Sequence, residues 1–279
     1  MSMTFYNAGS NINGTFSLTG LNDWDVSKVT DFSGMFNNCG SKASEWSIGD
    51  IIKWDLRSAE NLNNMFFLAG NKAKDWHIGN LSEWNVSNVK NFQSTFNQAG
   101  EYSESFSLGN LYKWNISKAE NISKMFYYAG YEAAQWYIGD ISNWDVSNVN
   151  DFSDMFYYAA NKCQNVSIGQ LIWNIESATT ATSMFENFAT GTIGLNLGEI
   201  YIKSDCNMDS IMKNCSNVKV TFRFAQKCSS YDNCFLNAAS GSTGDIQLIG
   251  DNNQVVQWLQ SIVNLYGPSG TQSKGNVRI

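Results

Sequence analysis

Six cysteines, one histidine and a series of recurring Asp and Asn residues are the side chains in this 279-residue sequence with the greatest potential for chemistry. Zinc sites commonly draw on paired cysteines, but no Cys-x-x-Cys pair occurs here. A catalytic histidine needs an oriented partner and a nucleophile within reach. His77 takes a repeated position that serine or tyrosine holds elsewhere, which is typical of a surface residue. We therefore expect no enzymatic activity, no metal and no cofactor.

The cysteines take positions that small or apolar residues hold in other parts of the sequence. Four of them align with alanine or methionine in this way: Cys39, Cys163, Cys215 and Cys234. Free cysteine commonly acts as a small core residue, so the alignment predicts reduced thiols that fill the core. A disulfide that involves Cys206 or Cys228 stays open as an alternative.

Aspartate and asparagine recur in two columns with a spacing of about thirty residues. The first column contains Asp25, Asp55, Asn85, Asn115, Asp145 and Asn174. The second contains Asp31, Asn61, Asn91, Asn121 and Asp151. One interpretation is a calcium ladder, since calcium binds several oxygen ligands. Because asparagine replaces aspartate freely, the columns favour a second interpretation, in which side-chain oxygens accept bonds from backbone amides and cap turns.

These columns belong to an internal repeat, which tryptophan marks most clearly. Tryptophans recur every thirty residues at Trp24, Trp54, Trp84, Trp114 and Trp144, and then one residue early at Trp173. Two further columns have the same period: Phe16, Trp46, Trp76, Phe106 and Trp136, and Phe36, Phe66, Phe96, Phe126, Phe156 and Phe185. One such unit cannot bury its apolar face alone, so the period predicts a stacked solenoid. Strict recurrence favours a core role for the tryptophans over a carbohydrate-binding platform.

Within one unit the pattern changes from strand to helix. Residues 46–49 alternate apolar and polar side chains, which predicts a short strand, and residues 54–56 form a second extended piece. Apolar residues at three- and four-residue spacing predict a helix from about residue 58 to 68. A capping-box sequence at Ser117–Glu120 and glycines such as Gly70 at the expected C-cap support this helix. The predicted fold class is an α/β repeat solenoid of short strands and short helices.

The units become shorter toward the C-terminus. Measured at the position of Phe36, the period falls from 30 to 29, then 27, then 23 residues. We expect about nine units over residues 1–250, with degenerate copies at both ends, and a capping helix over residues 251–266 that covers the last unit. Residues 267–279 have the composition of a linker, and we expect this tail to be an assembly element that a partner chain holds.

Aromatic residues that do not recur point to an interaction surface. Phe67, Tyr127, Tyr128, Tyr157 and Tyr158 take positions that asparagine or glutamine holds in other units, which indicates partial exposure. Stacking brings the four tyrosines together, and clustered exposed aromatics mark interfaces, with semi-buried packing as an equal alternative. A row of outward-facing strand positions is a second candidate: Ser47, His77, Ser107, Tyr137 and Ser167.

The units also carry a recognisable motif. The pattern Trp-Asp-Val-Ser-x-Val-x-Asp-Phe-x-x-Met-Phe, at residues 24–36 and 144–156, resembles a bacterial surface protein repeat of the BspA-like leucine-rich-repeat group. Residues 212–222 resemble the shorter treponemal-type repeat of that group. The resemblance extends over residues 1–250 and implies a right-handed, leucine-rich-repeat-like solenoid. It further implies a role on cell surfaces in adhesion and in contact with protein or glycan, and it supplies no catalytic residues.

Composition narrows the class of protein. The net charge is −7, with 25 Asp and Glu against 18 Lys and Arg and no basic run, so nucleic-acid binding is disfavoured. No apolar stretch is long enough for membrane insertion, and no signal peptide is visible. We expect a non-enzymatic, surface-exposed module that binds protein or glycan at the cell surface or outside the cell. The alternative is a structural or accessory subunit of a larger assembly, such as a phage virion or tail, that oligomerises through its C-terminal tail.

Overall fold

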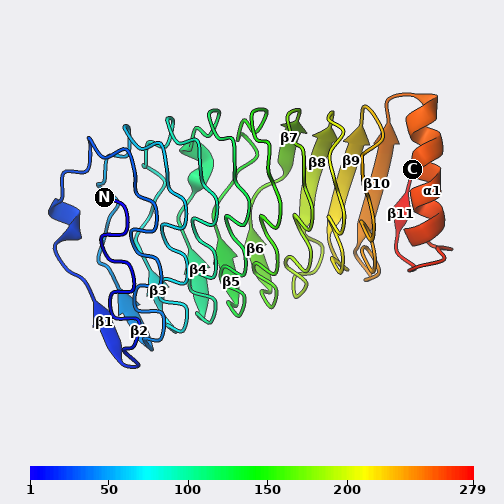
Figure 1. The fold of residues 1–279 in the computed structure, drawn as a ribbon. Helices are drawn as coiled ribbons and strands as arrows, with labels where there is room; N and C mark the ends of the chain where they lie inside the picture. Colours follow the sequence, from blue (N-terminus) through cyan, green and yellow to red (C-terminus); the bar gives the residue numbers. More distant parts are fainter.

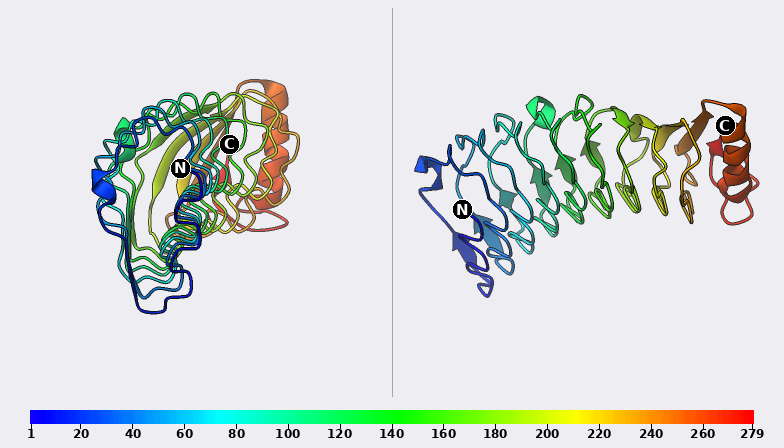
Figure 2. Two further views of the ribbon diagram at one scale, coloured as in Figure 1. Left: turned by 60° about the vertical axis from the view of Figure 1, so that its left-hand side comes forward. Right: turned by 45° about the horizontal axis from the view of Figure 1, so that its top comes forward.

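The computed structural model describes residues 1–279 and shows a β-solenoid of about ten turns, which confirms the predicted solenoid. Successive turns, or coils, stack along one axis from the N-terminus to the C-terminal helix (Figure 1). Figure 2 shows that coils near the N-terminus have a wider outline than those near the C-terminus. One core of 86 buried apolar residues runs through the stack, so each coil buries its apolar face against its neighbours.

Short parallel strands recur in the coils and pair with the strands of neighbouring coils. The first two sheets contain β1 (Thr15–Ser17), β2 (Glu45–Ser47), β3 (Trp76–His77), β4 (Ser105–Ser107), β5 (Gln135–Tyr137) and β6 (Asn165–Ser167). The third contains β7 (Leu171–Ile175), β8 (Asn196–Ile202), β9 (Lys219–Phe224), β10 (Asp245–Gly250) and β11 (Val277–Arg278). The sheet orders are β1-β2-β3, β4-β5-β6 and β11-β10-β9-β8-β7. A bridge between Asp75 and Ser105 joins the first two sheets into one face.

A second ladder, made of single-residue parallel bridges, sets the register of the coils. It connects Asp31, Asn61, Asn91, Asn121, Asp151, Thr180, Asn207 and Ser230 in that order. The spacing of these residues falls from 30 to 29, 27 and 23, which confirms the shortening predicted from the sequence. A solenoid accepts coils of different length because each coil contacts only its neighbours.

The aromatic columns form stacks of rings in the core. Neighbouring rings of the Phe36 column have centroids 5.3–5.7 Å apart and lie nearly parallel. Each indole Nε1 from Trp54 to Trp173 donates to a carbonyl of the preceding coil, as Trp114 does to Leu81 at 2.8 Å. These tryptophans are buried, so their core role is confirmed and the carbohydrate platform is wrong.

The predicted helix of each unit is wrong, because the segment forms a run of consecutive β-turns. We call this run the turn ribbon; its first copies span residues 33–42, 63–72, 93–102, 123–132 and 153–162. Inside the ribbon, alternate amides donate to the carbonyl three residues back, as Met65 donates to Leu62. The amides between them donate to a neighbouring coil, as Phe66 donates to Thr95 at 2.8 Å. Stacking thus satisfies half of the donors that a helix would satisfy internally.

The turn ribbon buries the side chains that the helix was expected to bury. Leu62, Met65, Phe66 and Ala69 all lie in the core. Spacing of three and four residues therefore identifies the buried face correctly without distinguishing a helix from successive turns. The capping-box segment starts no helix either, since the Ser117 amide donates to Oδ1 of Asn115 at 3.0 Å in a local turn.

Glycine lies near the end of the turn ribbon, where the backbone passes close to the core rings. Gly70 has a φ of +53°, and a Cβ at this position would lie 2.8 Å from the rings of Trp46 and Trp76. Glycine is needed here for its left-handed backbone and for the close approach, and not as a helix cap. Two coils beyond Gly100 the equivalent residue is Ala160, which has a φ of +49°. In that coil Val166 takes the place of the strand aromatic that Trp136 supplies one coil earlier.

The C-terminal part combines long strands with the one α-helix, α1 (Asn253–Tyr266), which covers the last coil (Figure 1). Two 3-10 helices, η1 (Leu21–Asp23) and η2 (Leu111–Lys113), lie in earlier coils. The tail beyond α1 packs against the last coil of the same chain. There β11 pairs with β10, and the Arg278 guanidinium donates two hydrogen bonds of 3.0 Å to the Asp245 carboxylate. Its proposed role in assembly stays a prediction.

Candidate binding surface

Five tyrosines from two neighbouring coils gather on the outside of the turn ribbon. We call Tyr127, Tyr128, Tyr131, Tyr157 and Tyr158 the tyrosine cluster. The ring centroids of Tyr127 and Tyr157 are 4.9 Å apart, and those of Tyr128 and Tyr158 are 4.8 Å apart, with near-parallel planes in both pairs. Tyr131 completes the group at 5.4 Å from Tyr128. All five side chains are half-buried.

The structure brings four of the five predicted patch residues together. Phe67 is half-buried on the same ribbon, but the coil that holds Asn97 separates it from Tyr127, and its ring contacts none of the tyrosines. Sequence reasoning missed Tyr131, although the same signal would have found it. The residues at its position in the adjacent coils are the polar Glu101 and Asn161, so it too is an aromatic that does not recur.

Tyr128 and Tyr158 have a left-handed backbone, with a φ of +54° at both. The same ribbon position has positive φ in the other coils, where asparagine is the common residue: Asn7, Asn38, Asn187, Asn214 and Asn237, with Leu68 and Gln98 in the remaining two. Asparagine tolerates this conformation, and its amides bond from coil to coil, as Asn38 Nδ2 does to Asn7 Oδ1 at 2.7 Å. Non-asparagine side chains at such positions cost on the order of 1–2 kcal/mol. The two tyrosines are therefore strained where asparagine would relieve the strain.

Lysines and carboxylates surround the tyrosine cluster. Lys162 Nζ lies 5.0 Å from the Tyr131 ring centroid and 2.6 Å from Glu132. The exposed Tyr102 ring lies in the preceding coil, and Lys72 Nζ of the coil before that is 3.3 Å from its centroid. Cations near ring faces gain stability from the ring quadrupole. Positive and negative side chains thus balance each other around the cluster, and the aromatic rings are what distinguish this surface from the ribbon in other coils.

Burial favours the protonated hydroxyl at three members of the cluster, Tyr127, Tyr128 and Tyr157. It raises the pKa of Tyr128 to about 12, with a smaller contribution from the neighbouring Tyr127. The pKa values of Tyr127 and Tyr157 are also raised, first by burial and then by nearby carboxylates such as Asp154 and Glu186. Neutral phenols both donate and accept hydrogen bonds, so the cluster offers polar contacts along its exposed ring edges.

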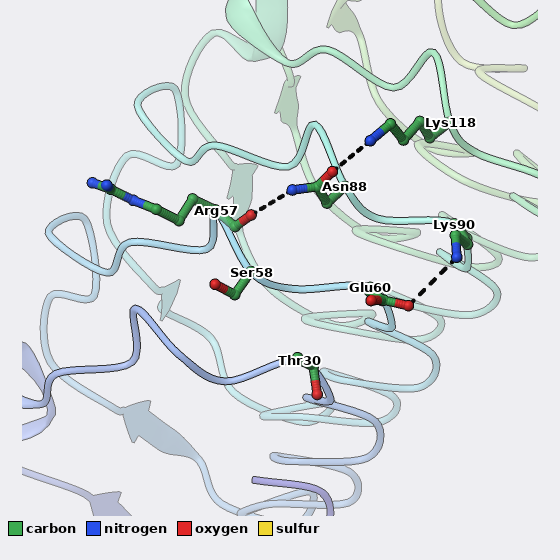
Figure 3. Close-up of a pocket in the computed structure, with 7 residues that line it drawn as sticks. All are labelled: Thr30, Arg57, Ser58, Glu60, Asn88, Lys90 and Lys118. Atoms are coloured by element: carbon green, nitrogen blue, oxygen red, sulfur yellow. Dashed lines mark hydrogen bonds and ion pairs between the residues drawn. The ribbon is translucent and has the colours of Figure 1, made fainter.

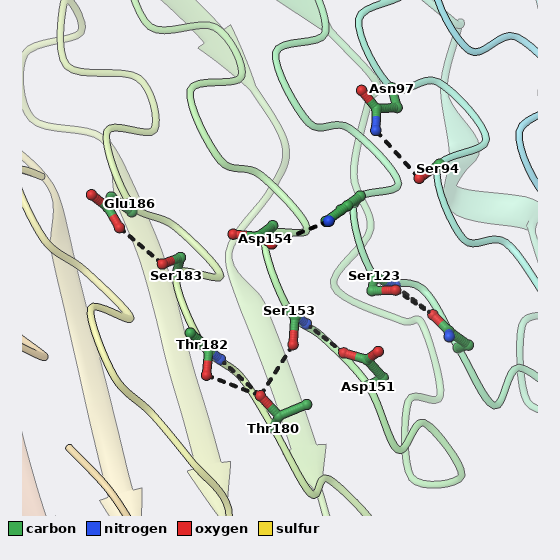
Figure 4. A network of polar contacts seen from close by, with 12 residues as sticks. Ser94, Asn97, Ser123, Asp151, Ser153, Asp154, Thr180, Thr182, Ser183 and Glu186 are labelled. Carbon is green, nitrogen blue, oxygen red and sulfur yellow. Dashed lines mark hydrogen bonds and ion pairs between the residues drawn. The ribbon is translucent and has the colours of Figure 1, made fainter. Parts of the chain in front are cut away.

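A network of hydroxyls and carboxylates supports the ribbon next to the cluster (Figure 4). Ser183 Oγ donates to Glu186 Oε2 at 2.8 Å, and Lys124 Nζ lies 3.9 Å from Asp154. Burial raises the pKa of Asp154 more than this lysine lowers it. Glu186 is buried and also pairs with Lys213 at 2.9 Å. These contacts hold the ribbon that carries Tyr157 and Tyr158 without occupying their hydroxyls.

The second predicted surface is a straight row on the sheet of β1 to β6. Ser47, His77, Ser107, Tyr137 and Ser167 are all exposed, and the pairing of the strands places them in register. Two of the serines serve local turns, since Ser47 Oγ accepts from the Gly49 amide and Ser107 Oγ accepts from the Gly109 amide. The row is accessible, but its binding role stays a prediction.

The Asp and Asn columns cap turns, as predicted, except at Asn174, whose Oδ1 has no hydrogen-bond partner. In the first column, Asn115 Oδ1 accepts from the Ser117 amide at 3.0 Å. In the second, Asp151 Oδ1 accepts from the Ser153 amide at 2.9 Å, and Asn207 Oδ1 accepts from the Asp209 amide at 2.8 Å. The same geometry recurs in nearly every coil, because each corner leaves an amide that needs an acceptor.

A polar groove that sequence reasoning missed follows the ladder of Asp31 and its equivalents (Figure 3). It has a volume of about 420 Å³ and is lined by Thr30, Arg57, Ser58, Glu60, Asn88, Lys90 and Lys118. Asn88 Nδ2 donates to the Arg57 carbonyl at 2.7 Å, and Lys118 Nζ donates to Asn88 Oδ1 at 2.6 Å. Ligand pockets combine apolar walls with a few convergent polar groups, whereas this groove has no apolar wall and its polar groups bind one another.

The four cysteines that align with core positions are buried free thiols, as predicted: Cys39, Cys163, Cys215 and Cys234. Burial raises the pKa of Cys39 and of Cys215 to about 12, so both stay protonated at neutral pH. A protonated thiol is a poor nucleophile, which agrees with a packing role. Cys206 and Cys228 are also buried.

No helix of the structure combines the length and apolarity needed to cross a membrane.

Comparison with known proteins places the repeats in a family. No curated protein and no solved structure matches the chain. Residues 1–131 and 105–225 match a family described as "Mycoplasma protein of unknown function, DUF285". Together the two overlapping matches extend over most of the solenoid, and the chain therefore belongs to the DUF285 family.

Proposed function

We propose that this chain is a non-enzymatic binding module that presents the tyrosine cluster to a protein partner at a cell surface. One observation carries the proposal: Tyr128 and Tyr158 hold a left-handed backbone at a position where five other coils use asparagine. Asparagine would relieve the backbone strain at this position, so the presence of tyrosine indicates that its side chain is needed for function. The surface location and the kinship with BspA-like leucine-rich repeats belong to this proposal and rest on the sequence motif of residues 24–36.

The chemistry of the cluster favours a protein partner over a glycan. Glycans bind aromatic rings through their flat faces, and here the inner faces of Tyr127 and Tyr157 cover each other at 4.9 Å. Half-buried rings that carry phenol hydroxyls suit the mixed apolar and hydrogen-bonding contacts of a protein interface. Tyrosine is also enriched among the residues that dominate binding energy at such interfaces.

The test is a binding screen of the full chain against arrays of cell-surface proteins and of glycans. The decisive variant is the double substitution Tyr128→Asn and Tyr158→Asn, which installs the residue that other coils use at that position. The matched control is Tyr6→Asn, which removes an exposed tyrosine from the N-terminal coil. We expect the double variant to keep its fold and to bind protein hits about 10–30-fold more weakly, whereas Tyr6→Asn binds normally. Protein binding that is unchanged in the double variant, or hits confined to glycans, would overturn the proposal.

A further inference from the structure

Two buried thiols lie next to each other where the shortest coils stack. The bridge between Asn207 and Ser230 sets the register there, and the Ser229 amide donates to the Cys206 carbonyl at 3.2 Å. Cys228 is thus one residue out of register with Cys206 in the neighbouring coil. With neighbouring coils about 4.8 Å apart, this diagonal places the two Cα atoms roughly 6 Å apart, which is the separation that disulfides favour.

The side chains of this pair point toward each other inside the core. Both residues are buried, and the two thiols are close enough for each to shift the pKa of the other. Other cysteines use their thiols differently, since Cys163 and Cys215 donate to backbone carbonyls at 3.0 and 2.7 Å. Cys206 and Cys228 are therefore a neighbouring pair of buried thiols, with Cys234 as the other thiol near Cys228.

We propose that Cys206 and Cys228 are a disulfide site that cross-links two adjacent coils when the protein is in an oxidising compartment. The inference is independent of the tyrosine cluster and of any binding activity. The neighbouring Cys228 thiol lowers the pKa of Cys206, which favours Cys206 as the attacking thiolate, and the Cys206 thiol raises the pKa of Cys228. Because both sulfurs are buried, the reaction takes place during folding or when the C-terminal coils open.

The oxidant is a small-molecule disulfide such as oxidised glutathione. The Cys206 thiolate attacks one sulfur of that disulfide and releases one glutathione thiolate, which takes up the proton that Cys206 lost. Cys228 then loses its proton and attacks Cys206 in the mixed disulfide, which releases the second glutathione. The protein thiols lose two electrons and two protons in total, and the oxidant leaves as two molecules of glutathione.

The bond would strengthen the part of the solenoid that has the fewest stacked rings. It closes a loop of the chain from residue 206 to residue 228, where the period has fallen from 27 to 23 residues. A cross-link of this kind restricts the unfolded chain and opposes unzipping of the C-terminal coils. An oxidised pair would also identify the compartment in which the protein works.

The first experiment is peptide mapping of the full chain after refolding in oxidised glutathione, without reduction. Trypsin releases residues 204–213 and cuts after Lys227, and chymotrypsin cuts after Tyr231, which separates Cys228 from Cys234. We expect the peptides of Cys206 and Cys228 to be detected as one cross-linked species, with a mass two hydrogen atoms below the sum of the two peptide masses. Recovery of both as free thiols, or of Cys228 joined to Cys234, would overturn the proposal.

A second measurement compares the Tm of the oxidised and reduced protein. We expect oxidation to raise the Tm by roughly 5–10 °C in the wild type and in the control Cys39→Ala, which removes a buried thiol far from the pair. The difference should vanish in Cys228→Ala. If Cys228→Ala does not fold, the peptide map of the wild type decides the question alone. A Tm difference that persists in a folded Cys228→Ala variant would assign the effect to another pair.

Discussion

The N-terminal coils and the C-terminal coils hold their stack together by different means. Up to Asp151 every coil has thirty residues, strands of two or three residues, and three columns of stacked rings. From Leu171 onward the coils shorten, and β7 to β10 lengthen to five to seven residues. The strand aromatic becomes Val166 and the tryptophan column ends at Trp173. Rings supply the contacts between coils in the first region, and the backbone ladder supplies them in the second.

This difference shows which constraint sets the length of a coil. Three aromatic columns fix three points on each coil, and the length can change between them: Trp144 still stacks on Trp173, and Phe156 on Phe185, across the first coil of 29 residues. Once two of the columns end, the coil shortens by several residues and the long strands keep the register through continuous pairing. The ladder of Asp31 and its equivalents continues through both regions, which makes it the common frame of the solenoid.

The largest expected effect comes from breaking a ring stack in the first region. Trp114→Ala removes a buried ring that contacts Trp84 and Trp144 at 6.3 Å, together with the Nε1 bond to Leu81. We expect a loss of about 3–5 kcal/mol in the free energy of unfolding, measured with urea. Trp114→Phe is the matched control, because it keeps a stacked ring and loses only the bond and some volume. Equal effects of the two substitutions would show that the ring stack contributes little.

The glycine near the end of the turn ribbon gives a second comparison between coils with and without a strand aromatic. Gly100→Ala adds a Cβ about 2.7 Å from the Trp76 ring at a φ of +51°, and we expect a cost of roughly 2–3 kcal/mol. The reverse substitution, Ala160→Gly, removes strain next to Val166 and adds unfolded-state entropy, so we expect a change within about 0.5 kcal/mol. Urea unfolding of both variants tests the comparison. Similar losses at the two positions would mean that the ring contact does not determine the need for glycine.

The sequence predicted the register of this fold better than its backbone conformation. Period and shortening follow from Phe36 and its equivalents, because buried rings must repeat at the same point of every coil. The turn ribbon could not be distinguished from a helix, since Leu62, Met65 and Phe66 are buried in both and the choice depends on hydrogen bonds to the next coil. The tyrosine cluster was visible as non-recurrent aromatics, but its left-handed backbone at Tyr128 follows from the turn geometry alone.

The shared ladder should respond equally in both regions. Asn121→Ala removes the acceptor of the Ser123 amide at 2.8 Å, and Asn207→Ala removes the acceptor of the Asp209 amide at 2.8 Å. We expect each substitution to cost about 1 kcal/mol, because each leaves one turn amide without its side-chain partner. Urea unfolding measures both. A loss at Asn207 that is several times the loss at Asn121 would show that the shorter coils depend more strongly on their turn caps.

The smallest expected effect concerns pH and the tyrosine cluster. The folded pKa of Tyr128 is about 12, above the ordinary value of 10, so the folded state holds its proton over a range in which the unfolded state releases it. This contribution to stability is complete below pH 10 and is lost as the pH rises toward 12. In the Tyr128→Asn and Tyr158→Asn double variant, the fall in Tm between pH 9 and pH 11 should be smaller than in the wild type, by about 2 °C. Tyr266, the last residue of α1, has its pKa raised by burial to about 12; it and the buried thiols titrate in both proteins and cancel in the difference. An identical fall in Tm in both proteins would mean that the Tyr128 hydroxyl is as well solvated in the folded chain as in the unfolded chain. The proposed binding surface would then consist of ordinary exposed phenols.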